Sequence, residues 1–210
     1  MIDFYRYTDT EVKKLLKSMV VIIDTNEQVY DHISSWFDKK KIPYIRQNMN
    51  FGDYGCYIPA NTDLGIPRDL YFDCVVERKA HLEEISGNLS ADRTRLENEF
   101  IRGKNSRFIL MIEKKENKEA MDLVNKLVKT STMKLNSEQM EILRSSMNGI
   151  GSFEEIINHK YDTKYHENSF IGSLLAFAHR YSIDIHFIDK AYSGRFIYEQ
   201  LQYYVREYLK

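Results

Sequence analysis

Three things are scarce in this chain of 210 residues, and each shortage excludes a class of protein. Its two cysteines, Cys56 and Cys74, are too few for a disulfide framework or a cysteine-rich zinc site. Its net charge of −1 lacks the basic excess of many nucleic-acid-binding proteins, so any such binding must rest on local clusters of cations. The apolar run 19–23 is far too short to span a bilayer. We expect a cytoplasmic protein without a membrane segment.

Two arrangements of the cysteines are open. Cys56 and Cys74 either face each other across a hairpin or lie as two small buried thiols in a reducing compartment, and we favour the second arrangement. The first residues, Met1-Ile2-Asp3, show no signal-peptide pattern, which also favours a cytoplasmic location.

Apolar periodicity predicts strands that alternate with helices along most of the chain. The expected strands are 19–24, 44–47, 108–112 and 183–188, and the expected helices are 8–18, 27–40, 90–102, 167–180 and 194–209. A hairpin is expected between them, with arms at about 51–59 and 70–79. This order predicts an α/β fold with a mixed central sheet flanked by helices.

Helical spacing also identifies the residues that should point into the core. We expect these to be Val29, Ile33, Trp36 and Phe37 in the helix 27–40, and Leu96, Phe100 and Ile101 in the helix 90–102. Residues 115–150 differ in composition, being rich in Lys, Glu, Met and Ser, and predict a helical insertion. The remainder, about 18–113 and 151–210, is expected to form the core of a single domain that spans 1–210.

The run Val75-Val76-Glu77-Arg78-Lys79 carries the chemistry that the sequence shows most clearly. Its apolar pair predicts a buried strand, on which Glu77 and Lys79 share one face while Arg78 faces away. An acid beside a lysine, with Asp53 upstream, suits metal-assisted hydrolysis of a phosphodiester. Carboxylates hold a hard divalent cation, and the lysine neutralises developing charge or orients a water.

A further acid, Asp24, closes the first predicted strand, and strand ends are where α/β sheets usually place their sites. An isolated acid of this kind is more often a helix cap or a solvated group than a ligand. The order and spacing of Asp24, Asp53, Glu77 and Lys79 are far more specific than any of them alone.

These motifs together resemble a known family. Ile23-Asp24-x-x-Glu27, Gly52-Asp53-Tyr54 and Val76-Glu77-Arg78-Lys79 are similar to the nuclease domain of the XPF-type structure-specific endonucleases, in the PD-(D/E)xK superfamily of metal-dependent nucleases. The resemblance resumes in 169–175 and 180–183, so it covers most of the chain. It implies a restriction-endonuclease-like core.

The resemblance also implies roles for particular residues. The catalytic residues would be Asp24, Asp53, Glu77 and Lys79, of which Asp24, Asp53 and Glu77 would bind Mg²⁺ or Mn²⁺. The residues implied in DNA binding are Glu27, Arg78 and Arg95, although strand position favours a structural ion pair for Arg78. The sequence departs from the family pattern in having Glu83 for the last aspartate of the signature and Asn26 for the arginine that often precedes Glu27.

The implied substrate is DNA with branches, flaps or forks, cut during replication, recombination or repair by a protein of bacterial or phage origin. The tandem helix-hairpin-helix module that follows many such domains is absent from the sequence, so a homodimer or a helix-hairpin-helix partner protein would extend the DNA-binding surface. The final helix offers an apolar stripe for a dimer, or for packing on its own sheet. The stripe consists of Phe196, Ile197, Leu201, Tyr204, Val205 and Tyr208.

Two alternatives belong to other classes of protein. One is a nuclease-like scaffold that binds DNA or protein without catalysis, but such proteins usually lose the lysine or an acid, and this chain keeps all four residues. The other is an unrelated α/β domain in which Glu77-Arg78-Lys79 is a coincidence. Agreement of the motifs near both ends of the chain argues against coincidence.

Overall fold

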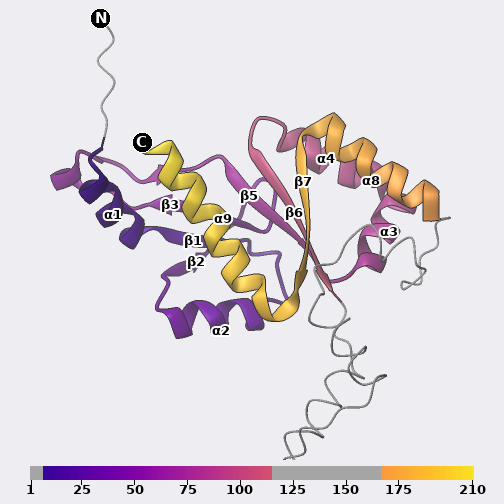
Figure 1. Ribbon diagram of the computed structural model, residues 1–210, viewed down its shortest axis with the longest axis horizontal. Coiled ribbons are helices and arrows are strands. Elements are labelled where there is room, and N and C mark those ends of the chain that lie inside the picture. The colour runs from indigo at the N-terminus through magenta and orange to yellow at the C-terminus, as the bar shows by residue number, and fades with distance from the viewer. Residues whose placement is uncertain (1–6, 115–166) are drawn as a thin grey trace, which may run out of the picture.

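A seven-stranded mixed sheet lies between two groups of helices in the computed structural model, which describes residues 7–114 and 167–210 (Figure 1). Both the predicted helical insertion at 115–150 and the start of the second core segment, at 151–166, lie outside the described residues. Within the described part, the predicted α/β class and mixed sheet are confirmed.

Strands and helices follow one another largely in the predicted order. The helices are α1 (Asp9–Ser18), α2 (Asp31–Lys40), α3 (Leu82–Ser90), α4 (Arg93–Arg102), α8 (Glu167–Tyr181) and α9 (Ser193–Tyr208). The strands are β1 (Val20–Ile23), β2 (Tyr44–Arg46), β3 (Tyr54–Ile58), β4 (Leu70–Tyr71), β5 (Cys74–Lys79), β6 (Arg107–Lys114) and β7 (Ile183–Asp189). Short 3₁₀ turns occupy Thr62–Leu64 and Lys190–Tyr192.

The strand order places the two chemically interesting strands, β3 and β5, side by side in the middle of the sheet. The order is β2-β1-β3-β5-β6-β7, and β4 pairs with β3 beside this path. Strand β3 runs antiparallel to both of its neighbours, β1 and β5. The pairs β1–β2, β5–β6 and β6–β7 are parallel. The predicted hairpin at 51–79 is therefore confirmed as the antiparallel pair β3–β5.

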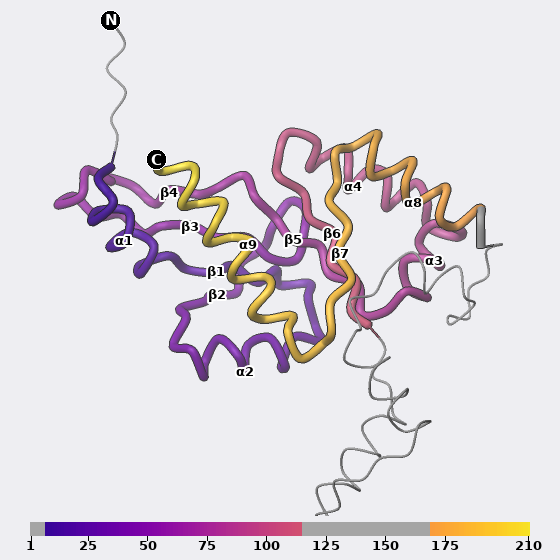
Figure 2. The backbone as a smooth tube through the Cα atoms, in the orientation of Figure 1, coloured from indigo at the N-terminus to yellow at the C-terminus, as the bar shows by residue number. Residues whose placement is uncertain are grey.

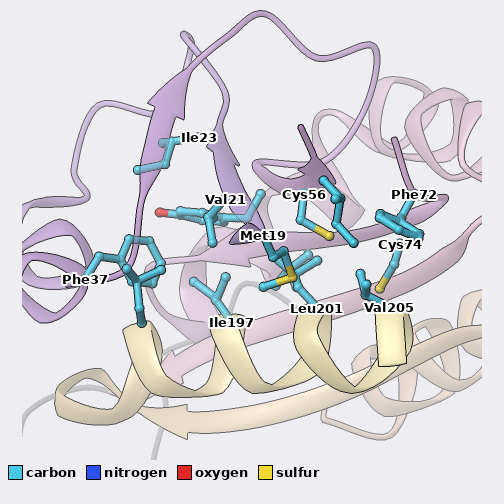
Figure 3. Packing of buried hydrophobic residues seen from close by; sticks show 14 of the residues in the cluster. Met19, Val21, Ile23, Phe37, Cys56, Phe72, Cys74, Ile197, Leu201 and Val205 are labelled. Atoms are coloured by element: carbon cyan, nitrogen blue, oxygen red, sulfur yellow. The ribbon is translucent and has the colours of Figure 1, made fainter. Parts of the chain in front are cut away.

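Two hydrophobic clusters fill the two faces of the sheet. On one face α1, α2 and α9 cover residues of β1, β3 and β5, and Figure 3 shows Ile197 of α9 on the side of Val21 and Val205 beside Cys74. On the other face α3, α4 and α8 cover alternate residues of β5 and β6. Each burial of a large aliphatic side chain stabilises the fold by about 1.5–3 kcal/mol, so these clusters supply most of the driving force.

Most of the apolar stripe of α9 is thus buried inside the domain. Ile197, Leu201 and Val205 have no solvent exposure, and Phe196 and Tyr204 are partly buried against the same cluster. Tyr208 remains 64% exposed, although its ring also contacts Phe72. Most of the stripe packs on its own sheet, and only its outer edge remains open to a partner.

Both cysteines are buried and free, as predicted, whereas the reducing compartment stays a prediction. Cys56 on β3 and Cys74 on β5 belong to the cluster under α9 (Figure 3). Burial raises the pKa of both thiols, so they behave as small apolar residues at neutral pH.

Three sequence-based expectations about helices are wrong. Helix α2 begins at Asp31 instead of residue 27, and Val29 is 63% exposed, because Arg46 Nη2 donates to the carbonyls of Thr25 and Glu27 and holds them in a loop. Ile101 is 51% exposed. The helix α3 was not expected, and the charged helix begins only at Arg93. None of the described helices is long and apolar enough to cross a membrane.

Candidate active site

Asp53 is placed by the glycine that precedes it. Gly52 has a φ of +71°, and a Cβ atom at this position would lie 2.9 Å from Cβ of Val75. Only glycine meets both conditions without strain. The chain can then enter β3 so that the amide of Asp53 donates to Val76 (3.0 Å) and its carbonyl accepts from the amide of Asp24 (2.8 Å). The backbone of Asp53 is therefore fixed between β1 and β5.

Glu77 and Lys79 project from β5 on the side covered by α3 and α4. Both side chains are buried, and Lys79 Nζ donates to Glu77 Oε1 at 2.5 Å. Strand alternation explains their shared face, as predicted. The second oxygen, Glu77 Oε2, is buried and has no hydrogen-bond partner. An unpartnered carboxylate oxygen in the interior is costly, which marks this position as unusual.

Asp53 completes the acidic centre beside this pair. Its Oδ2 accepts a hydrogen bond of 2.8 Å from the amide of Arg78, and its side chain keeps partial access to solvent. Burial raises the pKa of Asp53 to about 7, although the Arg78 amide opposes the shift. Burial and then the charge of Asp53 raise the pKa of Glu77 well above its usual range. The two carboxyl groups therefore cannot both ionise readily at neutral pH unless a further positive charge is present.

Lys79 supplies the single buried cation on this face of β5. Burial lowers the pKa of Lys79, but Glu77 above all, together with Asp53 and Glu84, outweighs burial and raises it. The ammonium therefore stays protonated at neutral pH. It can donate hydrogen bonds and offset negative charge, whereas it cannot act as a base.

The pair of Asp53 and Glu77 fits a divalent cation. A cation would partner the bare Glu77 Oε2 and would relieve the repulsion that raises both pKa values. In the ranges 7–114 and 167–210, no three His, Cys, Asp or Glu side chains gather closely enough to hold a metal by themselves. Mg²⁺ commonly takes one or two carboxylates and fills its other positions with water and substrate phosphate, which two acids can satisfy.

The backbone of Asp24 is hydrogen-bonded to that of Asp53, but the carboxylate of Asp24 binds other groups. Its Oδ1 accepts from the amide of Met49 (3.2 Å) and from the hydroxyl of Thr25, and its Oδ2 accepts from the amide group of Asn26. These contacts close the turn after β1. The predicted role of Asp24 as a metal ligand stays a prediction, and it requires the side chain to turn or to act through water.

Arg78 points to the opposite face of the sheet, as the strand pattern predicts. Its guanidinium is buried between Glu27 (3.0 Å) and Glu113 (2.7 Å). Glu113 also accepts from Ser193 Oγ at the start of α9 and contacts His32 of α2, each at 2.6 Å. The predicted contacts of Arg78 and Glu27 with DNA stay predictions, since both side chains lie inside this network.

Sequence reasoning missed Glu113 as the centre of this network. A signal for it exists, because Glu113 directly follows the apolar run 108–112, just as Asp24 follows the first strand. Two other carboxylates lie near the acidic centre, of which Glu84 is visible in the sequence just after the signature, whereas Glu99 was missed. Glu84 Oε1 lies 3.9 Å from Lys79 Nζ, and the negative charge of Glu99 on α4 contributes to the raised pKa values of Asp53 and Glu77.

The remaining predicted residues lie around the rim. Arg95 is exposed on α4, on the same side of the sheet as Glu77. Glu83, which replaces the last aspartate of the signature, contacts His81 at 3.2 Å. His81 caps α3, because its Nδ1 accepts from the amide of Glu84. The structure thus brings Asp53, Glu77 and Lys79 into one centre and leaves the other predicted residues in supporting or peripheral positions.

Comparison with known proteins identifies the family and the fold of the chain. The family model described as the ERCC4 domain matches residues 23–199. Two solved structures of XPF from Aeropyrum pernix, one of them in complex with DNA, share the fold with a TM-score of 0.51 and 14% identity. They cover 88% and 90% of this chain, which spans only 64% and 66% of theirs. No curated protein sequence matches the chain.

Proposed function

The chain belongs to the ERCC4 domain family, and from that premise we propose that it is a divalent-metal-dependent endonuclease that hydrolyses phosphodiester bonds in DNA. The observation that carries the proposal is the buried pair of Glu77 and Lys79 beside Asp53, with Glu77 Oε2 unpartnered. The centre sets two acids against one lysine, so it is short of one positive charge.

The roles of the side chains follow from their positions. Asp53 and Glu77 would hold Mg²⁺ or Mn²⁺, with Asp24 assisting directly or through water. A metal held there would supply Lewis-acid chemistry that polarises the phosphate and lowers the pKa of a water. Lys79, which stays protonated, orients the attacking water or offsets the charge that develops on the phosphate. Arg95 contacts a neighbouring phosphate from α4.

The substrate in this proposal is DNA with branches, flaps or forks, in replication, recombination or repair. The solved XPF structure in complex with DNA shares the fold, which supports DNA as the ligand class. A homodimer or a helix-hairpin-helix partner protein adds the surface that the near-neutral net charge of −1 does not offer. The outer edge of α9, where Tyr203 and Tyr208 are more than half exposed, is available for such a contact. A cytoplasmic, bacterial or phage-encoded protein fits these assignments.

Cleavage of labelled linear, flap and fork DNA tests the proposal. The wild-type protein is compared with Lys79→Ala and with the control Lys39→Ala, which removes an exposed lysine from α2. Each protein is assayed with Mg²⁺, with Mn²⁺ and with EDTA. We expect metal-dependent cutting that favours a junction, a loss of about 10²–10³-fold in rate for Lys79→Ala, and no loss for the control.

Other results would count against the proposal. Cutting that survives the loss of Lys79 would mean that the active site is placed wrongly. If a folded wild-type protein cuts none of the substrates at high concentration, with or without a helix-hairpin-helix partner, a catalytically inactive scaffold is the better description.

A further inference from the structure

A shallow polar groove runs along α4, outside the centre of Asp53, Glu77 and Lys79. It is lined by Ala91, Asp92, Thr94, Arg95, Asn98 and Arg102. Positions 94, 98 and 102 are spaced four residues apart, and position 95 lies three before 98, so these four side chains share one side of the helix. We call this surface the α4 groove. Its side chains are mainly hydrogen-bond donors, with Asp92 as its only acid.

The two guanidinium groups of the α4 groove lack partners that most other arginines have. Neither Arg95 nor Arg102 forms an ion pair or hydrogen bond with any described residue, and both are exposed. By contrast, the arginines that contact a carboxylate are Arg78, Arg107, Arg180, Arg195 and Arg206. Asp92, and Glu99 between the two arginines, offset part of this charge, but each exposed guanidinium without a partner among the described residues can still contact an anionic group. This favours an anionic ligand.

The position of the groove connects it with the candidate active site. Helix α4 covers the sheet face from which Glu77 and Lys79 project, in the cluster that contains Val75, Leu96 and Phe100. Glu99 lies between Arg95 and Arg102 along the same helix face, and its charge acts on both Asp53 and Glu77. A polyanion that reaches the acidic centre along α4 therefore passes the groove.

We propose that the α4 groove binds the sugar-phosphate backbone of the DNA next to the bond that is cut. Arg95 and Arg102 each contact a phosphate, and Thr94 and Asn98 donate hydrogen bonds between them. The two arginines stand about 10 Å apart along the helix axis, a length over which duplex DNA presents several phosphates. This inference rests on the proposed function and extends it, because it assigns Thr94, Asn98 and Arg102 to substrate binding without sequence preference.

Fluorescence anisotropy with labelled duplex and fork DNA in EDTA tests the groove without cleavage. Dissociation constants are measured between low and moderate salt for the wild type, Arg95→Gln, Arg102→Gln and the double variant. The control is Arg68→Gln, which removes another exposed arginine two residues before β4, and β4 lies well away from α4 (Figure 2). Thermal unfolding confirms that each variant is folded, since exposed substitutions of this kind change stability little.

For each single groove variant we expect a loss of affinity of about tenfold and a salt slope reduced by about one. The double variant should reduce the slope by about two, and Arg68→Gln should leave it unchanged. The inference is overturned if the double variant binds DNA as the wild type does, or if Arg68→Gln weakens binding equally. In either case, cleavage that still depends on Lys79 leaves the proposed function standing. A wild type that neither binds nor cuts DNA overturns both.

Discussion

The guanidinium of Arg78 and the carboxylate of Glu113 pair at 2.7 Å between the neighbouring strands β5 and β6, on the face of the sheet opposite to Glu77 and Lys79. Because Arg78 stands between these two residues in the chain, its anchored side chain also holds the strand that presents them. Its amide donates to Asp53 as well. One residue thus links the buried polar network to the candidate active site.

Removing this cation should destabilise the domain strongly. Arg78→Met leaves Glu27 without its ion-pair partner and Glu113 with one partner fewer, and breaking a buried pair in this way costs about 3–5 kcal/mol. Urea unfolding measures the change. The matched control is Arg195→Met, which breaks the exposed pair with Glu199 and should change the free energy of unfolding by less than about 1 kcal/mol. Equal effects of the two substitutions would contradict the structural role given to Arg78.

Glu113 should make stability depend on pH in the acid range. Burial acts to raise the pKa of Glu113, but hydrogen bonds from His32, Arg78 and Ser193 outweigh it and lower the pKa from 4.5 to about 2. The stability that ionised Glu113 contributes is complete above pH 4.5 and is lost as the pH falls toward 2. Glu113→Gln should therefore lower stability at pH 7 and show a shallower decline in acid. Urea unfolding at several pH values between 7 and 3 measures this, and parallel curves for the two proteins would refute it.

Asp53 should destabilise the metal-free protein at neutral pH. Its pKa in the fold, about 7, lies above the ordinary value of 3.8, so the contribution of Asp53 to stability is greatest below pH 3.8 and is lost as the pH rises through 7. Asp53→Asn should raise the free energy of unfolding by about 1–3 kcal/mol at pH 8 in EDTA. The control Asp73→Asn, at an exposed position, should have little effect.

The same pair of variants reports on metal binding without an activity assay. Mg²⁺ or Mn²⁺ should raise the melting temperature of the wild type and of Asp73→Asn, because a ligand that binds only the folded state stabilises it. The metal should leave Asp53→Asn almost unchanged. A similar rise in all three proteins would place the metal elsewhere.

Two glycines offer a test of how the backbone places Asp53. Gly52→Ala introduces a Cβ atom 2.9 Å from Val75 at a φ of +71°, and we expect a loss of about 1–3 kcal/mol together with weaker metal binding. Gly87→Ala, within α3, meets no atom within 4 Å and should stabilise the protein by about 0.5–1 kcal/mol. Thermal unfolding and metal titration compare the two. A neutral effect at Gly52 would show that the turn tolerates a side chain.

Local patterns in the sequence predict those features of the fold that depend only on residues close together in the chain. Strand alternation places Glu77 and Lys79 on one face and Arg78 on the other, because the period of two holds wherever β5 forms. The network of Arg78, Glu113 and Ser193 is different. It joins residues 35 and 80 positions apart, and such contacts depend on which strands and helices become neighbours.

The errors at the helix ends have a similar cause. Periodicity extends the second helix back to Val29, but the contacts of Arg46 with the carbonyls of Thr25 and Glu27 hold that segment as a loop. A side chain from another strand thus overrides a local preference. The same region explains why the carboxylate of Asp24 does not join Asp53 and Glu77. It accepts hydrogen bonds from Thr25 and Asn26 in the turn that precedes this loop.

The contact between Ser193 and Glu113 has a consequence for the order in which the protein matures on the ribosome. Strand β5, which carries Glu77 and Lys79, is synthesised long before α9, yet the polar network behind it, and the apolar cluster beneath it, are complete only when α9 docks. Domains fold as units, and a nascent chain that ends before Ser193 carries every candidate catalytic residue without the support that holds them in place. The residues that complete the candidate site's support are thus among the last to be synthesised.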